Sequence, residues 1–176
     1  MIRLFRVARL CSILIGVTAL FGCTGNNIPE GQPSFYQDLA GPAAALDANA
    51  AQSMISGYRG NNGLGALTID PELMRLANEQ ATAMAARGAL DHSAGAPFAD
   101  RIRKSHFDAS VAVENIGAGY HTLAEAFSGW RDSPPHRANM LKAGVTRMGI
   151  AAVYAPNSKY KVFWALILAA PDERRS

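Results

Sequence analysis

Residues 160–168 read YKVFWALIL, and every residue from Val162 to Leu168 is apolar. Successive side chains of a β-strand point to opposite faces of its sheet, so a strand over this run has two apolar faces. Such a strand needs helices on both sides of the sheet to cover it. The run therefore predicts an α+β fold, a three-layer α-β-α sandwich with a small, mainly antiparallel sheet.

Two further strands complete the expected sheet. Residues 147–154 form one of them, and the turn sequence Ala155-Pro156-Asn157-Ser158 joins it to the apolar run as a hairpin. A shorter strand is expected around residues 111–116. Its apolar residues surround Glu114.

Helical periodicity predicts four helices around this sheet. The best defined begins after Asp70-Pro71 and ends at Gly88, because aspartate favours the N-cap, proline the first turn and glycine the position after the last turn. The others are expected over about residues 46–58, with Leu46, Ala50, Met54 and Tyr58 on one face, after the capping box that opens at Thr122, and after Ser133-Pro134, whose serine can cap the helix. The apolar stripe of the best-defined helix is Leu73, Leu76, Ala77, Gln80, Ala81 and Met84.

The N-terminal segment is typical of an export signal. Arg3, Arg6 and Arg9 precede the apolar run of residues 10–21, which is too short to span a bilayer comfortably. The following Gly22-Cys23 completes a sequence similar to the bacterial lipoprotein box, in which the cysteine sulfur is acylated and becomes the new N-terminus. We expect an exported protein anchored through Cys23, and in a Gram-negative host Thr24 favours the outer membrane facing the periplasm.

The chain divides into four segments on this interpretation. They are a signal peptide (1–22), the acylated cysteine and a flexible linker (23–42), one domain (43–170) and a charged tail (171–176). The net charge of +3 comes entirely from the three arginines of the signal, since the rest of the chain carries 14 basic and 14 acidic side chains. A neutral body has no electrostatic surface for phosphates, so we expect no nucleic-acid partner.

Three polar side chains are the best candidates for chemistry: His92, Glu114 and His136. Two imidazoles and one carboxylate suit a divalent transition metal such as zinc, and a glutamate among apolar neighbours needs a partner. Their spacing of 22 residues on each side of Glu114 is weak evidence for a metal site. The alternative is that Glu114 forms a structural hydrogen-bond network with Asn115, Arg101 or Arg137 while the histidines cap loops.

The order of these segments resembles that of the CAP superfamily, named for cysteine-rich secretory proteins, antigen 5 and pathogenesis-related proteins, and in particular its bacterial branch. The resemblance covers about residues 46–168. It is carried by Tyr58-Arg59, Gly63-Leu64, Leu67, Asp70-Pro71-Glu72-Leu73, Ala77, Ala81, Asp91-His92-Ser93, Phe98, Arg101, Glu114-Asn115-Ile116, Trp130, Ser133-Pro134, His136-Arg137-Ala138-Asn139-Met140-Leu141 and Met148-Gly149-Ile150.

The resemblance implies the same sandwich and a cavity formed by His92, His136 and Glu114, with Arg101, Asn115, Arg137 and Asn139 supporting it. Animal and plant members often have a second glutamate three residues after the helix tryptophan, where this chain has Ser133. The implied site is a triad that holds zinc or another divalent cation weakly.

Family members have been associated with sterol or lipid binding, metal binding and proteolysis, and fold alone does not choose among these functions. We expect a non-enzymatic envelope protein whose cavity binds a divalent cation or a small, lipid-like ligand. One alternative is a metal- or histidine-dependent hydrolase with Glu114, His92 or His136 as the general base. The other is a structural or adhesive module.

Overall fold

The computed structural model describes residues 31–172. Its helices and strands are interspersed along the chain, and a short 3-10 turn precedes them. In order they are η1 (Ser34–Tyr36), α1 (Ala48–Gly60), β1 (Thr68–Ile69), α2 (Pro71–Arg87), α3 (Phe98–Lys104), β2 (Ala109–Ala118), α4 (Leu123–Asp132), α5 (Pro134–Met140), β3 (Arg147–Tyr154) and β4 (Val162–Pro171).

The strand order of the sheet is β1-β3-β4-β2. β4 pairs antiparallel with both β3 and β2, whereas the two-residue β1 pairs parallel with β3. Every residue of β4 from Val162 to Ala169 is buried. The prediction of a mainly antiparallel sheet with an apolar central strand is confirmed, and β2 is longer at each end than predicted.

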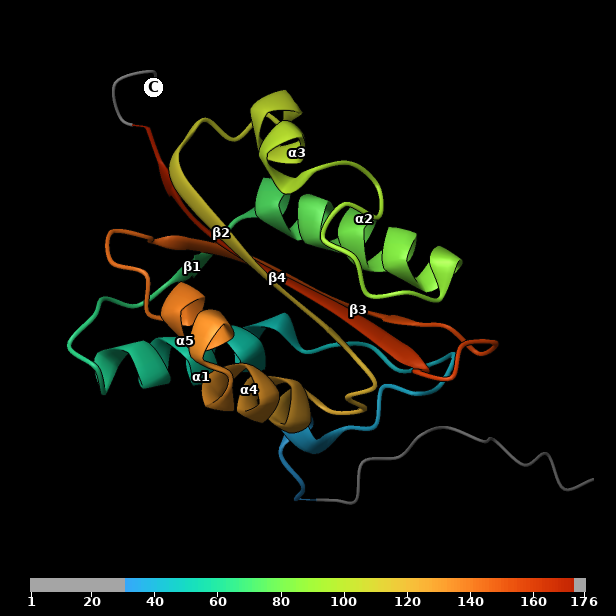
Figure 1. The fold of residues 1–176 in the computed structure, drawn as a ribbon. Coiled ribbons are helices and arrows are strands. Elements are labelled where there is room, and N and C mark those ends of the chain that lie inside the picture. Colours follow the sequence, from blue (N-terminus) through green and yellow to red (C-terminus); the bar gives the residue numbers. More distant parts are fainter. Residues whose placement is uncertain (1–30, 173–176) are drawn as a thin grey trace, which may run out of the picture.

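The sheet lies between two helical layers (Figure 1). α2 and α3 lie on one side, and α1, α4 and α5 lie on the other. The buried side chains form one cluster on each side of the sheet. The cluster on the α2 side contains Ile167 of β4, and the cluster on the α4 side contains Trp164 of β4. The three-layer α-β-α sandwich is therefore confirmed.

The termini of α2 follow the sequence signals. The Asp70 side chain accepts hydrogen bonds from the backbone N–H groups of Glu72 and Leu73. Gly88 ends the helix in the left-handed conformation, at φ +62°. The predicted stripe is buried throughout, including Gln80.

α2 packs very closely on the sheet at Gly149 of β3. A Cβ atom on Gly149 would overlap with the backbone of Leu73 and Met74 in the first turns of α2. The missing side chain is thus what allows the helix backbone to rest directly on the strand.

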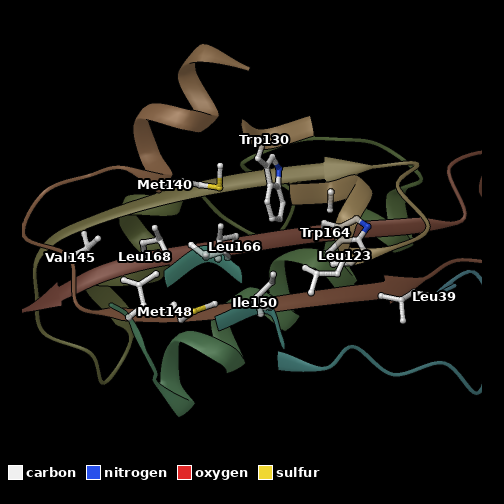
Figure 2. Close-up of a cluster of buried hydrophobic side chains, with 14 of the residues drawn as sticks. Leu39, Leu123, Trp130, Met140, Val145, Met148, Ile150, Trp164, Leu166 and Leu168 are labelled. Atoms are coloured by element: carbon white, nitrogen blue, oxygen red, sulfur yellow. The ribbon is translucent and has the colours of Figure 1, made fainter. Parts of the chain in front are cut away.

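The larger cluster is centred on two tryptophans (Figure 2). Trp130 of α4 and Trp164 of β4 meet edge to face, with ring centroids 6.4 Å apart. Each indole N–H donates to a backbone carbonyl, Trp130 to Ile116 and Trp164 to Tyr120. These bonds satisfy the polar atoms of two large buried side chains.

The structure corrects two predictions about the helices. α1 begins at Ala48 after an Asp47 cap, and its fully buried residues are Ala51, Ile55 and Arg59, whereas Ala50, Met54 and Tyr58 of the predicted face are only partly buried. Ser133 precedes α5, but its side chain makes no capping hydrogen bond.

Part of the predicted linker packs on the domain. Leu39 is buried, and its backbone N–H donates to the carbonyl of His121. The signal peptide, Cys23 and the end of the charged tail lie outside the described residues. Between residues 31 and 172 no helix is both long and apolar enough to cross a membrane.

Candidate functional site

The predicted residues gather around the edge strand β2. Glu114 and Asn115 are consecutive on β2, so their side chains point to opposite faces of the sheet. Arg101 of α3 and His92, in the turn after α2, lie on the Glu114 side. His136 lies on α5, in the layer that Asn115 faces.

Glu114 is a buried carboxylate with two partners. Its side chain is only 2% exposed, and Oε2 accepts a 2.6 Å hydrogen bond from Nη2 of Arg101. Oε1 lies 2.9 Å from Nδ1 of His92. Pairing with a guanidinium offsets the desolvation cost of this carboxylate, which answers the sequence argument that Glu114 needs a partner.

The contact with Glu114 also determines which ring nitrogen carries the proton in neutral His92. A carboxylate only accepts hydrogen bonds, so the neutral imidazole carries its proton on Nδ1 and its lone pair on Nε2. Nε2 lies on the opposite side of the ring from Glu114, and the His92 side chain is 55% exposed. The site therefore presents an oriented imidazole acceptor to solvent.

Buried side chains hold the backbone that carries His92. Gln80 Nε2 donates to the carbonyl of Asp91 at 2.7 Å. Arg101 donates from Nη2 to the carbonyl of His92 at 3.3 Å, and from Nε to that of Ala96 at 3.1 Å. The segment between α2 and α3 is thus fastened at three carbonyls.

A second network fixes α5 to the other side of β2. Asn115 donates to the carbonyl of His136 at 2.9 Å, and its Oδ1 accepts from Asn139 at 2.9 Å. Asn139 also donates to the carbonyl of Glu114 at 3.0 Å. Trp130 donates from its indole N–H to the carbonyl of Ile116. Asn139 and Trp130 thus supply hydrogen-bond donors to two backbone carbonyls of the edge strand.

The supporting residues differ in how closely they join the site. Arg101, Asn115 and Asn139 hold its parts together. Arg137 is exposed and makes a long hydrogen bond of 3.4 Å to the carbonyl of Arg131 on α4, within the helical layer.

His136 is half-buried, and burial lowers its pKa below the ordinary value of 6.5. The charge of His92 lowers it further, so the two imidazoles interact across the edge of the sheet. His136 is therefore neutral at pH 7 and can act as a ligand or acceptor.

We expect the ring protons of His136 to titrate in NMR with a midpoint below 6.5, and His92→Gln to shift that midpoint upward by removing the neighbouring charge. Because the folded state binds this proton less readily than the unfolded state, the contribution to stability is present above about pH 6.5 and is lost as the pH falls toward the lower folded value. A midpoint at or above 6.5 would contradict this.

The metal-ligating capacity of this geometry rests on the imidazoles. Both oxygens of Glu114 are engaged, and within residues 31–172 no three histidine, cysteine, aspartate or glutamate side chains form a group that could hold a metal ion. The unprotonated ring nitrogens of neutral His92 and His136 suit a borderline metal such as zinc. Ligation by all three predicted residues stays a prediction, as does the hollow around them.

One buried polar residue with a major structural role was not predicted as part of any site. Arg59 is 1% exposed and donates to the carbonyls of Gly65, Met140, Lys142 and Val145. It ties the end of α1 to the end of α5. Its spacing of four from Ile55 was the available signal, since that spacing places it on the buried face of α1.

The fold and the order of these motifs define a CAP domain. The profile described as CAP, the cysteine-rich secretory protein family, matches residues 52–168, and the chain belongs to this family.

A curated bacterial protein is similar to part of this chain. The uncharacterized protein YkwD of Bacillus subtilis is 30% identical over 129 residues, which are 64% of this chain and 50% of YkwD. The chain thus spans about half the length of this curated relative.

Two solved structures share the fold. An extracellular protein with an SCP domain from Bacillus anthracis has a TM-score of 0.61 at 21% identity, over 69% of this chain and 39% of that chain. An outer surface protein of Borrelia burgdorferi has a TM-score of 0.62 at 18% identity, over 73% of this chain and 98% of that chain.

Proposed function

We propose that this chain is an exported, lipid-anchored binding protein of the bacterial cell envelope, with its ligand site at His92, Glu114 and His136. The single observation that carries the proposal is the His92–Glu114–Arg101 arrangement. A buried, charge-paired carboxylate holds an exposed imidazole in one tautomer, and surface histidines without a function have no need of such an orienting partner.

The ligand would be a divalent cation or a small polar-headed, lipid-like molecule. A cation would be held by the two imidazoles, and water would complete its coordination. Two protein ligands give weaker retention than the three or four of established zinc sites, so exchange with the medium would be rapid.

Zinc titration of the purified protein by calorimetry tests the proposal. We expect saturable binding at pH 7 whose affinity falls at least about tenfold in His92→Ala/His136→Ala. Lowering the pH below the pKa of His136 should weaken binding, because protonated imidazole cannot bind metal.

His106→Ala is the matched control, because His106 is exposed on the segment after α3 and is not one of the proposed ligands. It should bind like the unaltered protein. Equal heats from the double variant and the control would remove the cation from the proposal.

A hydrolase is the second candidate, because the Glu114–His92 pair is also the arrangement that orients a general base. It would activate a water molecule, since within the described residues no hydroxyl group is hydrogen-bonded to either imidazole. It predicts turnover of envelope peptides or esters that is lost in Glu114→Gln, whereas a binding protein shows no turnover before or after this change.

The location in the envelope is supported by the N-terminal sequence and by relatives described as extracellular or outer-surface proteins. Two or more acyl chains on Cys23 would anchor the protein stably, since each buried CH₂ contributes about 0.8 kcal/mol. Intact-mass measurement of the protein extracted from membranes tests this part. A mass that includes residues 1–22 without acylation would contradict it.

A further inference from the structure

The unsatisfied buried polar atoms of residues 31–172 belong to two side chains that support the backbone around His92. Across residues 31–172 only two buried side-chain polar atoms lack a hydrogen-bond partner, Gln80 Oε1 and Arg101 Nη1. Both belong to the side chains that hold the carbonyls of Asp91 and His92. Buried polar groups without partners are costly, so their coincidence at one segment needs an explanation.

Gln80 is the more unusual of the two. It is 0% exposed and lies within an otherwise apolar stripe of α2 that packs on the sheet. Its single hydrogen bond leaves Oε1 unpaired, and a methionine or leucine of similar volume would avoid this desolvation cost. Its place in the stripe is thus unfavourable for stability, and its one side-chain hydrogen bond within residues 31–172 is with the segment that carries His92.

We infer that Gln80 is a positioning residue, which fixes the backbone at Asp91 so that the His92 imidazole meets Glu114 and directs Nε2 outward. The inference deepens the proposed function, because the orientation matters only if His92 receives a ligand. Arg101 works together with Gln80, since it holds the next carbonyl of the chain and also Glu114. A buried residue on α2 thereby determines the geometry of an exposed one.

The contacts show why both supports are needed. Among residues 31–172, the exposed His92 ring is hydrogen-bonded only through Nδ1, and this bond requires the backbone to stay within reach of a carboxylate on a different element. The Asp91 side chain accepts from the backbone N–H of Ser93 and fixes the local turn, and its 3.6 Å ion pair with Arg87 of α2 is exposed and too weak to anchor the turn to the domain. That anchoring comes from Gln80 and Arg101.

The variant Gln80→Met tests the inference by separating stability from orientation. We expect its thermal midpoint to equal or exceed that of the unaltered protein, because an unsatisfied buried acceptor is removed. We expect the Nδ1-protonated signature of His92 in long-range ¹⁵N–¹H spectra to be lost and replaced by exchange between tautomers. Zinc affinity should fall about tenfold, as when an outer support of a metal ligand is removed.

Leu76→Met is the control, because it changes the same buried stripe one turn earlier. It should leave the His92 spectrum unchanged. Gln80→Leu is a second variant, which tests the same role if methionine packs poorly at this position.

The inference is overturned if either Gln80 variant keeps the Nδ1-protonated signature, or if both lose thermal stability while zinc affinity stays the same. The spectra do not depend on any ligand. If the unaltered protein fails to bind zinc while its His92 signature still depends on Gln80, the cation proposal fails and the positioning role stands.

Discussion

Replacing Gly149 by alanine is expected to lower the free energy of unfolding by about 3 kcal/mol. The added methyl group would overlap with the backbone of Leu73 and Met74, which cannot rotate away as a flexible side chain can. α2 must then lift from β3 along the interface that also contains Ile150. The gain in strand propensity from glycine to alanine, below about 1 kcal/mol, cannot offset this.

Chemical denaturation followed by circular dichroism measures the effect. Gly57→Ala is the matched control: Gly57 is exposed within α1, and its added Cβ would meet no atom within 4 Å. That substitution should stabilise the protein by about 0.5–1 kcal/mol. Similar small effects at both positions would show that α2 does not rest on the strand as described.

Arg59→Met is expected to cost about 3–5 kcal/mol, because it leaves the backbone carbonyls around the end of α5 without their donor. Methionine keeps much of the apolar stem, so the loss reports mainly on the four hydrogen bonds. Burial lowers the pKa of Arg59, which remains charged at every pH of interest.

Arg75→Met is the control for this prediction. The Arg75 side chain is 46% exposed and pairs with Glu72 and Glu79 on the surface of α2, so its loss should cost less than about 1 kcal/mol. Arg59→Lys should fall between the two, since one ammonium group cannot span four carbonyls. A cost below about 1 kcal/mol for Arg59→Met would contradict the anchoring role.

The sequence predicted the parts of the fold whose signals are local. Asp70, Pro71 and Gly88 act within one or two turns, so the bounds of α2 followed from them directly. The continuous apolar run of β4 required burial on both faces, which determined the layer architecture. The predicted face of α1 is only partly buried, and Arg59 on its fully buried face was missed because an arginine looks polar in a periodicity argument and finds three of its carbonyl partners more than 80 residues away.

The candidate site was predicted as a set of residues but not as an arrangement. Nothing in the spacing of His92, Glu114 and His136 shows that Glu114 and Asn115 send their side chains to opposite faces of an edge strand. Each of the two interpretations of Glu114 predicts one of its observed contacts. The structural alternative predicts the pairing with Arg101, and the site hypothesis predicts the contact with His92. Gln80 was missed because one amide in an apolar stripe gives no separate signal.

The central position of β4 has a consequence for how this molecule forms. β2 and β3 do not pair with each other, and both pair with β4, which follows them in the chain. During vectorial synthesis a nascent chain cannot close the sheet until residues 162–171 have emerged. Closure then pairs β4 with β2, which lies far from it along the polypeptide, and such non-local pairing slows folding.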